Sequence, residues 1–121
     1  DWVVLRYSDV LLMHVEAIMA GGASTTSSNA IASFQTVRNR AGLTDAVTSI
    51  SKQELADERR AELAFENHRF FDLVRLGLAQ DVLSAFSTAN GLGYSTTDLL
   101  LPMPQVEIGL SNGLLSQNPG Y

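Results

Sequence analysis

The 121-residue sequence contains no cysteine, which excludes disulfide bonds and cysteine-based metal sites. This absence does not identify a cellular compartment, because many secreted proteins also have none. Positive charge is scarce: 8 Lys and Arg stand against 13 Asp and Glu, for a net charge of −5. Binding to nucleic acid needs a cationic face for the phosphates, so this balance argues against nucleic acid as a partner. No run of 18 apolar residues occurs, so the sequence predicts no membrane-spanning helix.

The sequence begins at Asp1 without a methionine and shows no signal peptide. We therefore expect it to be a piece of a longer protein, with any export signal upstream. Its composition is that of a globular protein, with 45% apolar and 17% charged residues. The length suits one domain, so residues 1–121 are predicted to form a single helical domain.

Apolar residues surround the first predicted helix, which runs from about Leu5 to Ala20. A helix that is apolar all round is buried on most sides, so we expect further elements to pack against it. Gly21 and Gly22 end the helix. A second helix is predicted from about Asn29 to Ala41, and with the first it forms a helical hairpin.

A capping box of Ser51 and Glu54 predicts the start of a third helix, which we expect to continue at least to Phe65. Asn67 and His68 predict a bend. Further helical pieces are predicted from the apolar spacing and the glycine and proline positions, at residues 69–76, 78–88 and 104–110. The remaining tail, residues 111–121, is rich in Asn, Gly and Ser and is predicted to be irregular. No repeated strand alternation is present, so the predicted fold class is all-α.

The densest charge cluster lies between residues 58 and 75, where eight charged side chains alternate with leucines, valine and phenylalanines. Arg59 and Arg69 each lie three residues from an acid, and Asp72 and Arg75 repeat this spacing. We predict that Arg69 is the buried partner of Glu66 and that Arg38 and Arg40 reach the block from the second helix. The predicted structural ion-pair network comprises Arg59, Glu62, Glu66, Arg69, Asp72 and Arg75.

A competing interpretation treats Glu62 and Glu66 as the paired carboxylates of a glycoside hydrolase. The neighbouring arginines disfavour it. An acid held by arginine has a lowered pKa and cannot donate a proton near neutrality. No other enzyme signature is present, and the sequence predicts a protein that is not an enzyme and uses no cofactor.

The two histidines, His14 and His68, lack a second ligand at helical spacing, so no metal site is predicted. The candidate ligand-binding residues are aromatic side chains, which can stack on sugar rings. Tyr94 lies in a loop of small polar residues and is the better candidate, followed by Trp2. Trp2 and Tyr7 are both also interpreted as residues that seal a helix against its neighbour.

Five motifs occur in the order found in the SusD/RagB family, and the chain resembles that family over essentially its whole length. They are Leu5–Met13 with Glu16-Ala17, Val37–Leu43, Glu58–Arg75, Leu101–Gln105 with Glu107-Ile108, and Gln117–Tyr121. The departures are Ser8, where the family commonly has alanine, and Asn67, where it commonly has glycine. Asparagine also tolerates a left-handed bend, so we expect the turn to persist.

The resemblance implies an all-α fold built on tetratricopeptide-like helix pairs, of which this chain is the C-terminal portion. It implies an outer-membrane surface lipoprotein that binds a glycan or another nutrient and partners a SusC-like TonB-dependent transporter. The lipid anchor and signal peptide are expected upstream. The matched motifs are architectural, so no ligand-contacting residue follows from them. A second interpretation remains open, in which this region is an interaction scaffold that touches no ligand.

Overall fold

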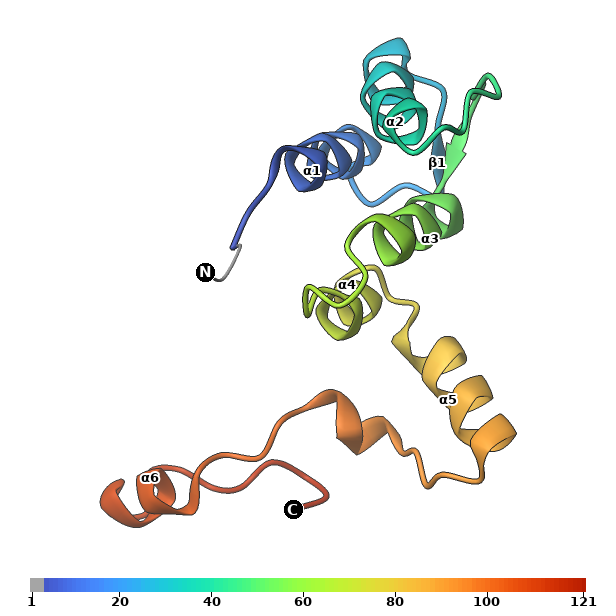
Figure 1. The fold of residues 1–121 in the computed structure, drawn as a ribbon. Coiled ribbons are helices and arrows are strands. Elements are labelled where there is room, and N and C mark those ends of the chain that lie inside the picture. The colour runs from blue at the N-terminus through green and yellow to red at the C-terminus, as the bar shows by residue number, and fades with distance from the viewer. Residues whose placement is uncertain (1–3) are drawn as a thin grey trace. The chain divides into compact units, whose positions relative to one another are not determined.

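The computed structural model describes residues 4–121, and the chain divides into two compact units (Figure 1). Unit 1 comprises Asp1–Leu76 and unit 2 comprises Gly77–Tyr121. The expectation that both belong to a single domain stays a prediction.

Unit 1 is mainly helical, and the predicted all-α class is confirmed. No helix in the described part of the chain is long and apolar enough to cross a membrane. The elements of unit 1, in chain order, are α1 (Tyr7–Met19), β1 (Ser24–Thr25), α2 (Ser28–Arg40), β2 (Ile50–Ser51), α3 (Lys52–Glu62) and α4 (Arg69–Arg75).

The predicted hairpin of α1 and α2 is present, with each end within two residues of its expected position. Helix α1 ends at Met19. The next residue, Ala20, has a left-handed φ of 47°, and Gly21 follows at a φ of 81°. Glycine takes such angles without steric cost, so the pair after α1 allows the chain to reverse. The chain then leads through β1 into α2, which packs against α1.

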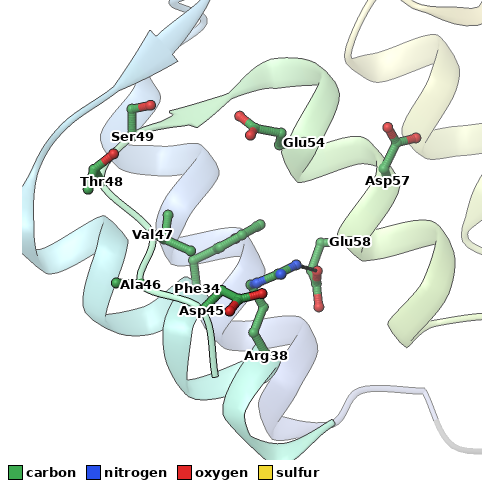
Figure 2. Close-up of a pocket in the computed structure, with 10 residues that line it drawn as sticks. All are labelled: Phe34, Arg38, Asp45, Ala46, Val47, Thr48, Ser49, Glu54, Asp57 and Glu58. Carbon is green, nitrogen blue, oxygen red and sulfur yellow. Dashed lines mark hydrogen bonds and ion pairs between the residues drawn. The ribbon is translucent and has the colours of Figure 1, made fainter. Parts of the chain in front are cut away.

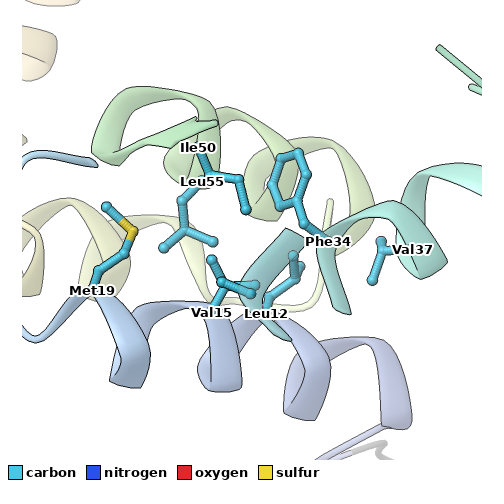
Figure 3. Close-up of a cluster of buried hydrophobic side chains, with 8 residues drawn as sticks. Leu12, Val15, Met19, Phe34, Val37, Ile50 and Leu55 are labelled. Carbon is cyan, nitrogen blue, oxygen red and sulfur yellow. The ribbon is translucent and has the colours of Figure 1, made fainter. Parts of the chain in front are cut away.

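The apolar core of unit 1 lies between α1, α2 and α3 (Figure 3). Leu12 and Val15 project from one side of α1 and are fully buried, while Phe34 and Val37 come from α2. Both pairs are three residues apart, which places their members on one helix face. Ile50 from β2 and Leu55 from the first turn of α3 complete the cluster, and Met19 and Ala30 add to it.

The sequence analysis predicted no strands, whereas the structure contains a small antiparallel sheet. In it Ser24 pairs with Ser51 and Thr25 pairs with Ile50. Each strand has two residues, too few to produce a detectable alternation of apolar and polar side chains. The sheet links the loop after α1 to the start of α3 and helps to hold Ile50 in the core.

The capping box at the start of α3 is confirmed. The Ser51 hydroxyl accepts from the Glu54 amide at 3.2 Å, and the Glu54 carboxylate accepts from the Ser51 amide at 2.7 Å. The expected extension to Phe65 is wrong, because α3 ends at Glu62. Phe65 and Asn67 have φ angles of 66° and 63°, which no right-handed helix accommodates. Asn67 thus provides the left-handed bend expected of it.

Unit 2 contains α5 (Ala79–Asn90), the 3-10 helix η1 (Thr96–Leu99) and α6 (Gln105–Leu110). Its C-terminal tail forms no regular element but contacts the segment around η1. The Gln117 side chain bonds both backbone groups of Met103, at 2.7 and 2.9 Å. Asn118 and Tyr121 donate to the carbonyls of Leu101 and Leu100, at 2.6 and 3.0 Å. These four bonds fix the tail.

Candidate functional site

A buried arginine links three helices of unit 1. Arg59 on α3 is only 3% exposed, and its Nη1 donates to Asp9 Oδ1 on α1 at 2.8 Å. Its Nε donates to Asp72 Oδ2 on α4, also at 2.8 Å. A buried charge is tolerated when it is paired and hydrogen-bonded. Arg59 therefore connects α1, α3 and α4 through two charge-assisted bonds.

The spacing of three residues suggests an ion pair between Arg59 and Glu62, but the two side chains have other partners. Arg59 points toward α1 and α4, whereas Glu62 accepts from Arg6 Nη1 at 2.5 Å and from Arg40 Nη2 at 2.6 Å. The Glu62 side chain is 4% exposed. Residues three apart on a helix are neighbours, but they pair only when neither side chain is engaged elsewhere. Here Arg59 and Glu62 each bind partners on other segments of the chain. Those partners are distant in sequence, so the local sequence around α3 does not reveal them.

The expected pairing of Glu66 with Arg69 is wrong. Glu66 accepts from Arg6 Nε at 2.9 Å, and Arg69 donates to the carbonyl of Ala56 at 3.3 Å. Within residues 4–121 Arg69 forms no ion pair. Between Glu66 and Arg69 lies the left-handed Asn67, so helical spacing does not apply to them. Burial lowers the pKa of Arg69.

The second predicted helix does supply cations to the central block, as expected. Arg38 Nη1 donates to Glu58 Oε2 at 3.0 Å, in addition to the contact of Arg40 with Glu62. At the other end of the block, Arg75 Nη2 donates to Asp72 Oδ1 at 2.7 Å. Arg75 also forms an ion pair with Glu16 on α1. The acids and arginines therefore pair mainly between elements rather than along α3.

The protonation of Glu62 and Glu66 bears on the hydrolase interpretation. Burial opposes ionisation of Glu62, but hydrogen bonds from Arg6, Arg40 and Ser8 outweigh it, so the pKa of Glu62 is lowered. The hydrogen bond from Arg6 likewise lowers the pKa of Glu66. A general acid must carry its proton near the working pH. The arrangement instead holds both carboxylates ionised.

One cavity, here called the acidic pocket, lies between α2, α3 and the loop of residues 45–49 (Figure 2). Its volume is about 420 Å³. Arg38 and Phe34 line it together with four carboxylates, those of Asp45, Glu54, Asp57 and Glu58. Phe34 is nearly buried, so its ring presents little face to a ligand.

Three carboxylates of the acidic pocket already have protein partners. Glu58 is paired with Arg38, and the Ser51 hydroxyl binds Glu54 and lowers its pKa. Asp57 accepts from the Gln53 side chain at 3.1 Å. Sequence analysis missed this pocket, because the loop that closes it carries no recognised pattern.

A second cavity, here called the tyrosine pocket, lies between the start of α1 and the end of α2. Its volume is about 350 Å³. The lining residues are Arg6, Tyr7, Ser8, Leu11, Thr36, Val37 and Arg40. Tyr7 is 72% exposed, so it does not seal α1 as the sequence analysis expected. Tyr7 belongs to the first family motif, but the sequence does not determine the orientation of its ring.

Neither aromatic candidate from the sequence lines the acidic pocket or the tyrosine pocket among the described residues. Tyr94 in unit 2 is half-buried, and its hydroxyl donates to Gln80 Oε1 at 3.1 Å. Trp2 lies outside the described residues.

In the part of the chain that the structure describes, no three histidine or acidic side chains lie close enough together to bind a metal ion. His14 Nδ1 lies 2.9 Å from the Ser33 hydroxyl on α2 and so joins the helical hairpin.

The geometry is that of a helical framework joined by ion pairs. Comparison with known proteins identifies the family to which this framework belongs. The model of the SusD family matches residues 1–121. The chain belongs to the SusD family. A SusD-like protein P2 of Formosa agariphila is 34% identical to it over 137 residues, covering 100% of this chain and 26% of the relative. The starch-binding protein SusD of Bacteroides thetaiotaomicron is 30% identical and is covered to 22%.

Solved structures of SusD-like proteins have the same fold. A laminarin-binding SusD-like protein superposes with a TM-score of 0.75 at 39% identity, over 98% of this chain and 23% of that one. Surface glycan-binding protein A from Bacteroides thetaiotaomicron gives a TM-score of 0.79 at 31% identity, over 98% and 24%. The present chain thus spans about a quarter of the length of these relatives.

Proposed function

We propose that the protein binds glycans at the outer cell surface as a SusD-like nutrient-binding protein. The observation that carries this proposal is family membership over the whole chain, together with relatives whose names state laminarin, starch and surface-glycan binding. This chain supplies a helical part of such a protein. Binding proceeds by aromatic stacking and hydrogen bonds, without a chemical step.

The ion pairs support binding without catalysis. Glu62 and Glu66, the carboxylates of the hydrolase alternative, are both held by Arg6, and Glu62 also by Arg40. Hydrolysis of a glycosidic bond requires one protonated and one free carboxyl group beside the sugar. Neither group meets that requirement here.

Titration calorimetry of the full chain with laminarin and with soluble starch tests the binding proposal. We expect heat of binding for at least one polysaccharide and no new reducing ends after prolonged incubation. Absence of binding to a broad set of glycans contradicts the proposal. Turnover that disappears in Glu62→Gln contradicts the non-enzymatic part and supports the hydrolase alternative.

We further propose a SusC-like TonB-dependent transporter as partner and the outer membrane as location, with attachment through a lipid anchor upstream of this chain. The support is the resemblance to the SusD family. Affinity purification from detergent-solubilised outer membranes tests the partnership, and we expect the transporter to copurify. Protease treatment of intact cells tests the location, because a surface protein is degraded while periplasmic markers persist.

Tyr94 and Trp2 remain the proposed ligand contacts. The alternative is that this region is an interaction scaffold that touches no ligand. The bonds of Arg59 to α1 and α4 favour the scaffold, since they serve the framework rather than a ligand. Replacing Tyr94 with alanine distinguishes the two. A weakened glycan affinity favours a direct contact, and an unchanged affinity favours the scaffold for unit 2.

A further inference from the structure

We propose that the tyrosine pocket binds one pyranose ring of a neutral glycan. This inference rests on the proposed glycan-binding function and assigns a subsite to it. The pocket of about 350 Å³ falls at the small end of the roughly 300–1,000 Å³ range of ligand sites. A single sugar ring, rather than an extended chain, suits that size.

The aromatic side of the pocket matches the apolar face of a pyranose. Tyr7 is 72% exposed in the first turn of α1, where it lines the cavity beside Leu11 and Val37. Tyrosine combines an apolar ring with a polar hydroxyl and serves surfaces where one end of a ligand is apolar and the other is wet. The C–H face of a sugar therefore packs on the ring, while its hydroxyls meet the polar residues of the rim.

The rim provides both hydrogen-bond acceptors and donors. The Thr36 hydroxyl donates to the carbonyl of Ala32 at 2.8 Å, so its oxygen is oriented to accept from a sugar hydroxyl. The hydrogen bonds of Arg40 within the described residues all use Nη2. Its Nη1 and Nε groups are donors, and the side chain is 65% exposed. Together these groups match vicinal hydroxyls, each of which both donates and accepts.

The pocket is held in place before a ligand arrives. Glu62 bonds both Arg6 and Arg40, so one buried carboxylate fixes the two guanidinium groups on the pocket wall. Arg6 also donates to the Ser8 hydroxyl and to the backbone carbonyl of Glu62. Fixing polar groups in advance reduces the entropy lost on binding. The ion pairs of the central block thus position the polar groups of the subsite.

The acidic pocket is the weaker candidate for this role. Its aromatic residue, Phe34, is only 3% exposed and stacks under Arg38 at 5.9 Å, so it offers no open ring. Three of its four carboxylates are engaged by Arg38, Ser51 and Gln53. Of the two pockets, the tyrosine pocket combines an exposed aromatic ring, that of Tyr7, with hydrogen-bond donors of Arg40 that have no protein acceptor among the described residues.

Affinity of the full chain for laminarin and soluble starch, measured for Tyr7 variants, tests the inference. We expect Tyr7→Ala to weaken binding by about tenfold, equivalent to about 1.4 kcal/mol, because the variant removes the ring on which the sugar packs. Tyr7→Phe keeps the ring and should stay within about twofold of the wild type, on the same ground. Val10→Ala is the matched control, because Val10 is an exposed residue of α1 that lies outside the pocket lining.

Nitration of tyrosine, followed by peptide mass mapping, provides a second readout that needs no variant. We expect Tyr7 to be nitrated readily in the free protein and to be protected by saturating polysaccharide. Resistance of Tyr7 in the free protein overturns the inference, because the ring is then covered by another part of the polypeptide.

The outcomes separate this inference from the proposed function. Wild-type binding with equal affinity in Tyr7→Ala overturns the subsite and leaves glycan binding intact. Equal affinity with a lowered melting temperature in Tyr7→Ala also overturns it, because the ring then packs against protein. A wild type that binds no glycan overturns both proposals.

Discussion

The two units of the chain are stabilised in different ways. Of the thirteen buried apolar residues described, twelve lie in unit 1, and only Ala79 lies in unit 2. All eight ion pairs of the described residues also lie in unit 1. Unit 2 instead relies on side chains that bond backbone groups, such as Gln117 with Met103. Its exposed leucines leave little apolar surface buried.

This contrast indicates where the stability of the chain resides. Apolar burial is the main favourable term in folding. It is concentrated in the helices that the ion pairs connect. A 45-residue unit with almost no buried apolar side chain cannot offset its conformational entropy by itself. We therefore expect substitutions in unit 1 to affect global stability and substitutions in unit 2 to act locally.

The largest effect is expected at Arg59. Replacing it with alanine leaves Asp9 buried without its cation and leaves Asp72 with Arg75 alone, which should destabilise unit 1 by about 3–5 kcal/mol. Denaturant unfolding of the full chain measures the change. Arg60→Ala is the matched control, since Arg60 is the exposed neighbour on the same helix and should alter stability by less than about 0.5 kcal/mol.

Leu55 tests the apolar half of the contrast. It is fully buried in unit 1, so Leu55→Ala should cost about 2–5 kcal/mol through lost burial and a residual cavity. Leu110 in unit 2 is largely exposed, and Leu110→Ala should change stability by less than about 0.5 kcal/mol. Thermal unfolding of both variants compares the units directly. Equal losses would remove the distinction drawn here.

A local effect is expected at Gly120 in unit 2. Its φ is 99°, and a Cβ there would lie 2.7 Å from Thr97 Oγ1, so Gly120→Ala should detach the tail at a cost of about 1–3 kcal/mol. Hydrogen exchange should rise in residues 97–103 and not in unit 1. Gly113→Ala is the control, because its φ is 85° but nothing lies within 4 Å. A change spread over unit 1 would show that the effect is not local.

The smallest effect is expected from acid titration. The pKa values of Glu62 and Glu66 are lowered in the folded state, mainly through Arg6. Near their unfolded value of 4.5 the unfolded chain therefore binds more protons, so stability falls as pH falls through that value and the lowered pKa. Unfolding measured between pH 7 and pH 3 should show this loss. Glu62→Gln should make the pH dependence shallower.

The sequence identified local features more reliably than long-range partners. The capping box of Ser51 and the left-handed bend at Asn67 follow from chemistry within a few residues, and both are present. The helix positions follow from apolar spacing and glycines. Phe65 was placed in α3 because its apolar side chain fits helical spacing, but its left-handed backbone is set by the turn into α4.

Ion-pair partners depend on which helices meet. Arg59 and Glu62 lie three apart in sequence, yet Arg59 reaches Asp9, which is fifty residues away. Arg6 appeared only as part of a family motif, although it binds both Glu62 and Glu66. Tyr7 was interpreted as a sealing residue because a ring near the start of an apolar helix is usually buried. Its exposure depends on the arrangement around the pocket, which no sequence window contains.

The charged side chains of unit 1 are mutual partners across helices. A double-mutant cycle tests this most directly, with Arg59→Met, Asp9→Asn and the double variant compared by denaturant unfolding. We predict a coupling energy of at least about 1 kcal/mol, the size expected of groups in one hydrogen-bonded network. Additive effects, with a coupling near zero, would contradict the account.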